Sequence, residues 1–381
     1  MSKHGWTYKK LGDVAEIVGG STPKTSNPDF WGGEHYWVTP AELGDFVYIN
    51  KTERTITDEA LAKTNLTLLP VGTVLLSSRA PIGKTAITTV PMYCNQGFKN
   101  IICSKVLNNK FVYYYINRIV PKLQSLGRGA TFKEISKSIV ESTTIPVPGM
   151  AEQEAIVAEL DEINKAIAAL QQQVADLDTL AQSTFYDMFG DPVTNPKAWP
   201  VKPMESVGEI IAGSTPSTTD ETNWDGDINW VTPAELGEQL YYGETVRKIT
   251  AKAAARLTLM PIGTVLLSSR APIGKLAIST VPMCCNQGFK NIVCHDNMNN
   301  IFLFFYLKLT MDKIVALGRG ATFKEVSKKE ISNYSVLFPP LALQQEFAAK
   351  VEAIEAAKAE LNAQIAEMQT LLASRMDYYF D

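Results

Sequence analysis

Eight pairs of polar side chains recur in the two halves of the sequence, and their types suit nucleic-acid binding. The loop LLSSRAPIGK occupies residues 75–84 and again 266–275, and CNQGFKNI follows each copy. Arginine pairs with guanine, asparagine and glutamine with adenine, and lysine anchors the phosphate backbone. The candidate DNA-binding residues are therefore Ser78, Arg79, Lys84, Asn95, Gln96, Lys99, Arg128 and Lys133, with their counterparts Ser269, Arg270, Lys275, Asn286, Gln287, Lys290, Arg319 and Lys324.

The same residues could instead hold turns that both copies share, since glycines such as Gly83 and Gly97 accompany them. That interpretation accounts less well for eight matched polar pairs, most of which are cationic. The sequence does not sort base-reading residues from phosphate anchors. Residues in a diverged stretch are equal candidates for specific readout: Lys51, Arg54, Lys63, Arg247 and Lys248.

Motifs that would indicate catalysis are incomplete. APIGKT lacks the first glycine of a phosphate-binding loop, and NPDF at Asn27 resembles an adenine-methyltransferase signature but has DETN as its counterpart at Asp220. His4, His35 and His295 are isolated, so none makes a plausible base or metal ligand. We expect no catalytic residue, no metal and no cofactor in this chain.

The five cysteines also favour a simple interpretation. Cys94/Cys103 and Cys285/Cys294 repeat a spacing that matches neither a zinc knuckle nor an evident disulfide plan. We expect them to be buried thiols in a reducing cytoplasm. No apolar run is long enough to span a membrane.

An internal duplication organises the whole chain of 381 residues. WVTPAELG begins at Trp37 and Trp230, 193 residues apart, and LGRGATFKE begins at Leu126 and Leu317, 191 apart. Two residues are lost between these landmarks, within the diverged stretches 45–68 and 238–259. TVLLSS, KTAITTV and FKNIICS are expected strands, and FVYYYINRI and IFLFFYLKL are expected apolar helices.

A long helix is expected after each copy, following the proline-rich segments IPVP and FPP. Apolar residues recur at steps of four and three, which is the 3.5-residue period of a left-handed coiled coil. Lys358 is the one polar residue in this seam, and such a residue often fixes register or partner. The predicted seam consists of Ile156, Leu160, Ile163, Ile167, Leu170, Val174, Leu177, Val351, Ile354, Lys358, Leu361, Ile365, Met368 and Leu372.

Charge is segregated along the chain. The net charge is −4, yet residues 1–149 carry +6 and 192–338 carry +2, whereas 150–191 carry −8 and 339–381 carry −4. DNA phosphates would attract the two copies and be repelled by the two helices.

Six motifs are distinctive when taken together: GGSTP at Gly19, LPVGTVLLSSRAPIG at Leu69, NQGF at Asn95, GATFKEI at Gly129, P-x-x-x-E-Q at 148–153 and FGDPVTNP at Phe189. In these motifs the chain resembles the specificity subunits of type I restriction-modification systems over essentially its whole length. The second copy departs from the family pattern at Gln344, where glutamate is common, and at Lys358.

This resemblance implies two target-recognition domains and an antiparallel pairing of the two helices. It also implies two methyltransferase subunits that bind S-adenosylmethionine and, optionally, two restriction subunits that use ATP and Mg²⁺. The complex would then be an adenine-N6 DNA methyltransferase and a site-specific deoxyribonuclease, with this chain as its non-catalytic subunit. We expect it to be cytoplasmic.

The predicted fold class is α+β, with two duplicated strand-rich domains and two long helices in an antiparallel coiled coil. The expected segments are recognition domain 1 (1–149), a central helix (150–190), recognition domain 2 (191–338) and a C-terminal helix (339–381). The predicted function is to read a bipartite, near-palindromic double-stranded DNA target and to dock the partner subunits. A protein–protein scaffold that binds no DNA, and an enzyme whose motifs are hidden, remain alternatives.

Overall fold

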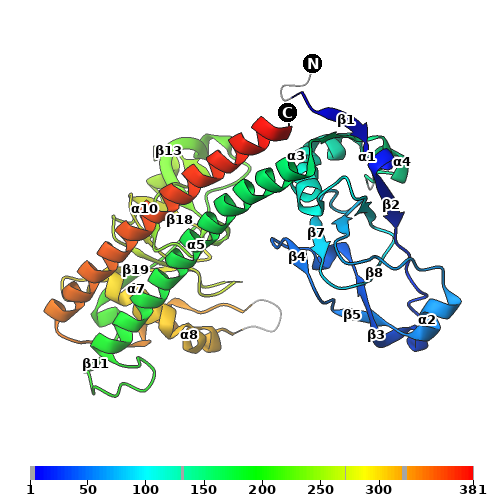
Figure 1. The fold of residues 1–381 in the computed structure, drawn as a ribbon. Coiled ribbons are helices and arrows are strands. Elements are labelled where there is room, and N and C mark those ends of the chain that lie inside the picture. Colours follow the sequence, from blue (N-terminus) through cyan, green and yellow to red (C-terminus); the bar gives the residue numbers. More distant parts are fainter. Residues whose placement is uncertain (1–4, 130–132, 271, 320–323, 381) are drawn as a thin grey trace. The chain divides into compact units, whose positions relative to one another are not determined.

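The structure is a computed structural model that describes residues 5–129, 133–270, 272–319 and 324–380. It divides into two compact units (Figure 1). Unit 1 comprises Met1–Leu170 and Ala363–Asp381, and unit 2 comprises Gln171–Asn362. Each unit therefore combines one sequence repeat with part of both long helices.

A five-stranded sheet with the order β2-β9-β6-β7-β4 forms the centre of unit 1. Its strands are short and apolar, and three of them fall in the runs that the sequence predicted as strands. Val74, Leu75 and Leu76 are all fully buried because this strand has neighbours in the sheet on both sides and cores on both faces. The strands are β2 (Ala15–Gly19), β4 (Tyr48–Ile49), β6 (Val74–Leu76), β7 (Thr85–Thr88) and β9 (Lys99–Cys103).

Two smaller sheets complete the strand-rich part of unit 1. A three-stranded sheet has the order β5-β3-β8, and a two-stranded sheet joins β1 to β10. The latter brings the start of the repeat to its end, with Thr7 paired to Val147. These strands are β1 (Thr7–Lys10), β3 (Trp31–Val38), β5 (Arg54–Ile56), β8 (Tyr93–Cys94) and β10 (Thr144–Val147).

Unit 2 repeats the topology strand for strand, with orders β12-β19-β16-β17-β14, β15-β13-β18 and β11-β20. The duplication seen in the sequence is thus a duplication of fold. The strands are β11 (Val201–Pro203), β12 (Gly208–Ala212), β13 (Trp224–Val231), β14 (Tyr241–Tyr242), β15 (Arg247–Ile249), β16 (Val265–Leu267), β17 (Leu276–Ser279), β18 (Met283–Cys285), β19 (Lys290–Cys294) and β20 (Ser335–Leu337).

The predicted apolar helices are α3 (Asn109–Leu126) and α7 (Asn300–Leu309). Asn108 and Asn299 cap them, each side chain accepting hydrogen bonds from two backbone amides of the first turn. Each helix packs against the central sheet of its unit. The shorter helices are α1 (Leu11–Val14), α2 (Asp58–Lys63), α4 (Lys137–Ser142), α6 (Ala251–Ala254), α8 (Met311–Leu317) and α9 (Lys328–Ser332), with 3₁₀ turns η1 (Pro28–Phe30), η2 (Pro40–Glu42), η3 (Met204–Ser206), η4 (Glu221–Asn223) and η5 (Pro233–Glu235).

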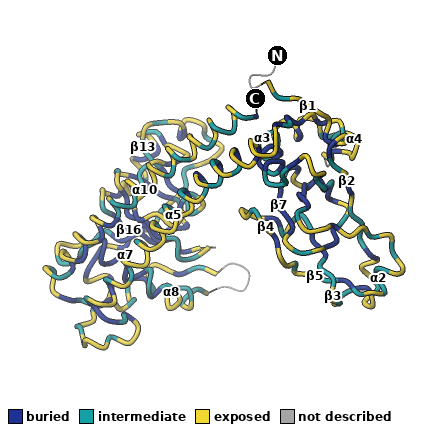
Figure 2. The backbone as a smooth tube through the Cα atoms, in the orientation of Figure 1, coloured by how far each residue is buried: buried dark blue, intermediate teal, exposed yellow. Residues whose placement is uncertain are grey.

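The two long helices are α5 (Met150–Phe189) and α10 (Leu341–Phe380). In unit 2 Asp178 of α5 bonds to Lys358 of α10, and Phe185 of α5 contacts Phe347 of α10. Residue numbers increase along α5 where they decrease along α10, so the two helices run antiparallel. All fourteen predicted seam residues are buried or half-buried, while most other positions in the middle of these helices are exposed (Figure 2). The seam period thus identified the contact face.

The C-terminal end of α10 completes the core of unit 1. Phe380 is buried, with its ring 5.3 Å from that of Phe111 and 5.6 Å from that of Tyr115. Arg375 forms an ion pair with Glu159 of α5, and the hydrogen bond from Arg375 lowers the pKa of that carboxyl.

The difference predicted at Gln344 lies one position earlier, at Leu343. Gln344 is buried and accepts a hydrogen bond from the Asn299 amide at 2.9 Å, as Gln153 does from the Asn108 amide at 2.8 Å. The two glutamines are therefore equivalent. The copies differ instead at Glu152, whose carboxylate accepts a hydrogen bond from the Trp6 indole at 3.0 Å and whose counterpart is Leu343.

Candidate nucleic-acid interface

Several of the matched polar residues of unit 1 converge on one carboxylate. Lys99 donates from Nζ to Glu134 Oε1 at 3.1 Å and to Ser78 Oγ at 3.2 Å. Arg79 approaches Glu134 Oε2 at 4.0 Å. Ser78 is fully buried and the Lys99 side chain is only 15% exposed, whereas the Arg79 side chain is 37% exposed. The cluster thus has an inner cation and an outer one.

Unit 2 contains the same cluster. Lys290 donates from Nζ to Glu325 Oε1 at 3.2 Å and to Ser269 Oγ at 3.2 Å, and Arg270 Nε lies 2.9 Å from Glu325 Oε2. Burial alone would raise the pKa of Glu325, but hydrogen bonds from Arg270 and Lys290 outweigh it and lower that pKa.

The sequence interpretation missed the two glutamates at the centre of these clusters. Glu134 and Glu325 lie inside the repeated motif GATFKE, and their identity in both copies was the available signal. The backbone of Glu134 also pairs with both Arg79 and Arg128, so this residue ties two loops together. A search for DNA-binding residue types alone could not find it, since a carboxylate repels phosphate.

The loop lysines Lys84 and Lys275 are half-buried. Lys84 donates from Nζ to the Leu43 carbonyl at 2.8 Å and so holds the loop after β3. The backbone amides of Lys84 and Lys275 are each bound by a serine hydroxyl, of Ser77 and Ser268, at 2.8 Å. Some of the residues that are identical in the two loops therefore maintain the loop conformation.

In the Asn-Gln-Gly turns, one polar side chain maintains the turn and the next is exposed. The side chains of Asn95 and Asn286 accept hydrogen bonds from the amides of Gly97 and Gly288, which closes each turn. Gln96 and Gln287 are exposed, and each accepts a hydrogen bond from a threonine hydroxyl, of Thr22 and Thr215. The asparagines shape the turn and the glutamines present polar atoms to solvent.

Four cations beside this cluster are exposed: Arg128, Lys133, Arg319 and Lys324. Arg319 forms an ion pair with Glu330 at 2.9 Å, and its side chain remains 86% exposed. These residues flank segments 130–132 and 320–323, where the rest of each GATF motif lies outside the described residues. The structure thus links Ser78, Arg79, Lys99 and Arg128 through Glu134, and their counterparts through Glu325, with an inner and an outer set. Lys84 and Gln96 have other partners, the Leu43 carbonyl and Thr22.

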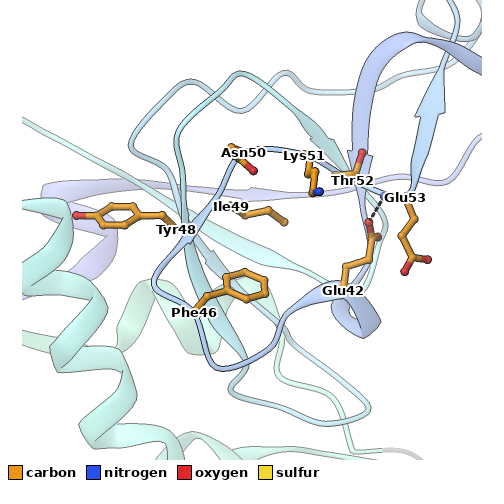
Figure 3. Close-up of a pocket in the computed structure, with 8 residues that line it drawn as sticks. All are labelled: Glu42, Phe46, Tyr48, Ile49, Asn50, Lys51, Thr52 and Glu53. Atoms are coloured by element: carbon orange, nitrogen blue, oxygen red, sulfur yellow. Dashed lines mark hydrogen bonds between the residues drawn. The ribbon is translucent and has the colours of Figure 1, made fainter. Parts of the chain in front are cut away.

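The diverged stretch of unit 1 encloses a hollow of about 490 Å³. Figure 3 shows Phe46, Tyr48 and Lys51 beside it, with the Glu42 carboxylate bonded to the backbone amide of Glu53 at 2.7 Å. Tyr48 is 51% exposed and Phe46 39% exposed, so aromatic faces are accessible here. The lining residues are Glu42, Phe46, Tyr48, Ile49, Asn50, Lys51, Thr52 and Glu53.

The two units differ at this hollow. Glu235 occupies the position of Glu42, and its carboxylate accepts hydrogen bonds from the Tyr242 hydroxyl at 3.0 Å and the Val246 amide at 2.8 Å. Unit 1 has Ile49 at the position of Tyr242, and Ile49 cannot make this bond. The diverged stretches therefore give each unit a different surface beside the shared cluster.

The histidines and cysteines have separate roles in the structure. His35 Nε2 lies 2.7 Å from the carboxylate of Asp58, and His4 lies outside the described residues. The cysteines are free; Cys94, Cys284 and Cys285 are buried, and burial raises the pKa of Cys94 to about 12. Cys103 and Cys294, expected to be buried, are half-buried. The described part of the chain contains no group of three His, Cys, Asp or Glu side chains suited to a metal ion.

Comparison with known proteins identifies the family. The family described as "Type I restriction modification DNA specificity domain" matches residues 3–177 and 196–368. The chain belongs to this family. It is a type I restriction-modification specificity subunit with two recognition domains, as the motifs predicted, and the family's members are subunits of type I restriction-modification complexes.

Individual proteins agree with this assignment. The "Type I restriction enzyme MjaIX specificity subunit" of Methanocaldococcus jannaschii is 28% identical over 371 residues, covering 91% of this chain and 86% of that protein. The chain also shares its fold with the "Type-I restriction-modification system S subunit from M. genitalium", with a TM-score of 0.53 and 13% identity over 99% of this chain and 96% of that one. A third similarity, with a TM-score of 0.62 and 20% identity, is to a chain from a study of "complex assembly" and "conformational transition of the type I R-M system", covering 99% and 97%.

No helix in the described part of this specificity subunit is long and apolar enough to cross a membrane. The α5 and α10 helices of the specificity subunit instead bury a narrow apolar seam.

Proposed function

We propose that this specificity subunit reads a bipartite double-stranded DNA target, one half with each unit, and contributes no catalytic group. The observation that carries this proposal is the duplicated cluster in which an inner lysine and a glutamate support an outward-facing arginine. Each unit thus holds one arginine in a fixed position. Two such arginines are suited to two contacts with DNA, whose phosphates recur at regular intervals.

The inner and outer residues of the cluster have different parts in this proposal. Ser78, Lys99 and their counterparts support the loops, because their polar atoms are bound within the protein. The DNA contacts come from the half-exposed and exposed residues: Arg79, Gln96, Arg128, Lys133, Arg270, Gln287, Arg319 and Lys324. Lys84 and Lys275 are half-buried and are assigned to neither set.

The long helices are the proposed docking surface for partner subunits. Leu180 of α5 is 49% exposed and Leu371 of α10 is 44% exposed, and both lie outside the seam. They are 191 residues apart, which is the offset of the repeat, so each unit presents one. Two equivalent apolar positions suit two methyltransferase subunits.

The remaining activities of the complex belong to other chains in this proposal. S-adenosylmethionine binds the methyltransferase subunits, and ATP with Mg²⁺ serves restriction subunits where these are present. The shared clusters predict two similar half-sites in inverted orientation around an unread gap. The diverged stretches 45–68 and 238–259 introduce any asymmetry.

The test is to express the chain with its methyltransferase subunits and map methylated adenines in the host DNA. We expect one bipartite motif, and specific binding of the purified complex to a duplex that contains it. A complex that methylates no defined sequence and binds all duplexes equally would support a scaffold role. Cleavage or methyl transfer by the purified chain alone, with DNA, Mg²⁺ and S-adenosylmethionine, would contradict the non-catalytic assignment.

A further inference from the structure

Each unit holds one arginine over two tryptophans. In unit 1 the Arg54 guanidinium carbon lies 3.5 Å from the ring centroid of Trp31 and 5.4 Å from that of Trp37. In unit 2 Arg247 lies 3.5 Å from Trp224 and 5.7 Å from Trp230. Such short distances are typical of cation–π contact.

The tryptophans are themselves held in place. Their rings meet edge to face, with centroids 4.9 Å apart in unit 1 and 5.1 Å in unit 2. The indole of Trp37 donates to the Ser21 carbonyl at 3.0 Å and that of Trp230 to the Ser214 carbonyl at 3.1 Å. A side chain whose polar end is bonded and whose face is packed has few rotamers left, so each pair is a rigid platform.

The strand register places the arginine on this platform. Arg54 is paired directly with Trp37, and a bulge between Trp31 and His35 sets both of these residues opposite Ile56, so that Trp31 also lies near Arg54. Arg247 is paired with Trp230 in the same way, and β13 has the equivalent bulge between Trp224 and Ile228. The bulge requires Gly33, because a Cβ there would lie 2.4 Å from the Ile56 carbonyl oxygen.

The platform fixes the arginine without using its hydrogen-bond donors. Arg54 and Arg247 are exposed, and no carboxylate among the described residues forms an ion pair with either. Guanidinium carries five N–H donors in a planar fork that matches two neighbouring acceptors. Stacking one face on indole leaves the edge of the fork oriented and available.

The arginine is the same residue in both units. Arg54 and Arg247 lie within the diverged stretches, in the segments TERTIT and TVRKIT, where their immediate neighbours differ because Glu53 corresponds to Val246 and Thr55 to Lys248. A residue needed only to cover tryptophan could be replaced by another long side chain. Retention of arginine on the same platform in both units points to use of its fork.

We propose that Arg54 and Arg247 are specificity-determining residues, each of which binds the N7 and O6 acceptors of a guanine in its half of the target. This inference rests on the proposed DNA-reading function. Arginine with guanine is the commonest bidentate base contact, and an oriented fork loses little freedom on binding. The platform acts as the positioning element for this contact.

The test compares Arg54→Lys and Arg247→Lys with the wild-type complex. Lysine keeps the charge but lacks the planar fork of arginine. We therefore expect about tenfold or greater loss of affinity for a duplex that contains the recognition motif. Binding to a duplex without the motif should change by less than about twofold, since the phosphate attraction is retained. In the methylation map of each variant, one position that requires a G·C pair in the wild type should accept other base pairs. This position should lie in a different half-site for each variant.

Trp31→Leu tests the platform separately, since it leaves Arg54 in place but removes its support. We expect a smaller loss at the same G·C pair. Lys105→Gln, which removes an exposed cation from the loop after β9, is the control and should leave the map unchanged. Circular dichroism and urea unfolding verify that each variant is folded.

The outcomes separate this inference from the proposed function. A wild-type complex that recognises no DNA sequence would overturn the proposed function itself. A wild-type complex with a defined motif, whose lysine variants keep both affinity and map, would overturn only the inference. Equal weakening on all duplexes with an unchanged map would also overturn it, because Arg54 and Arg247 would then anchor phosphate.

Discussion

Glu134 and Glu325 show how a residue that repels DNA can belong to a DNA-binding site. Each carboxylate neutralises an inner lysine and approaches an outward arginine, so the cationic loop is fixed before any phosphate arrives. The repeated cations could be predicted from sequence because their types were identical in both copies. Their division into inner and outer residues could not, because it depends on which side chains the folded loops bury.

The first prediction separates these two sets. Lys99→Met should lower the free energy of unfolding by about 1–3 kcal/mol, because Glu134 loses its half-buried partner. Arg128→Gln, at an exposed position, should leave that free energy unchanged and weaken DNA binding. Urea unfolding and a DNA titration of each complex measure the two effects. Equal effects of both variants on stability would contradict the division.

The pH dependence of unit 2 provides a second prediction. The pKa of Glu325 is lowered in the folded state, so its contribution is present above the ordinary carboxyl pKa and is lost as pH falls through the lowered value. Glu325→Gln should therefore be less stable than wild type at neutral pH. The difference should vanish in acid, as unfolding measured between about pH 3 and 7 would show. A difference independent of pH would exclude this role.

At the scale of elements, the sequence was most informative where the pattern is local. Helices α5 and α10 follow from the 3.5-residue period, and α3 and α7 from their long apolar runs. The strand orders could not be predicted, since parallel pairs such as β3 with β8 join segments far apart in the chain. The Arg54 platform was equally hidden, because it needs the bulge in β3. Lys51 and Lys63 remain candidates for DNA contact on sequence grounds.

The third prediction concerns helix α5 where unit 1 ends. Leu170 is a half-buried seam residue at this boundary. Leu170→Pro should cost about 3 kcal/mol, interrupt the helix and abolish modification of the bipartite target. Leu170→Ala keeps the helix and serves as the control. Methylation of the motif by the proline variant at the wild-type rate would show that an uninterrupted α5 is unnecessary.

At the scale of the whole molecule, duplication predicts paired partners. Leu180→Glu and Leu371→Glu each place a charge at one of the equivalent exposed positions. Each single variant should retain one methyltransferase subunit and the double variant none, because a buried unpaired charge strongly disfavours an apolar contact. Native mass spectrometry of the purified complexes counts the subunits. Full assembly of the double variant would place the docking surface elsewhere.

The fifth prediction uses the similarity of the two units. Replacing residues 238–259 with the sequence of 45–68 should make the two halves of the target more alike, because the shared clusters are already identical. Methylated-adenine mapping of the exchanged complex would then show a more symmetric motif. The reciprocal exchange is the matched control and should symmetrise the motif toward the other half. An unchanged motif in both exchanges would assign specificity outside these stretches.

The burial of Phe380 in the core of unit 1 has a consequence for biosynthesis. The ribosome makes Met1–Leu170 first, but Ala363–Asp381 emerges only after the whole of unit 2. At about 5–20 residues per second the delay is roughly 10–40 s. During this interval the surfaces of Phe111 and Tyr115 that Phe380 covers lack their partner. The domain translated first is therefore completed last, and a nascent chain that stalls within α10 leaves its earliest domain open to aggregation and proteolysis.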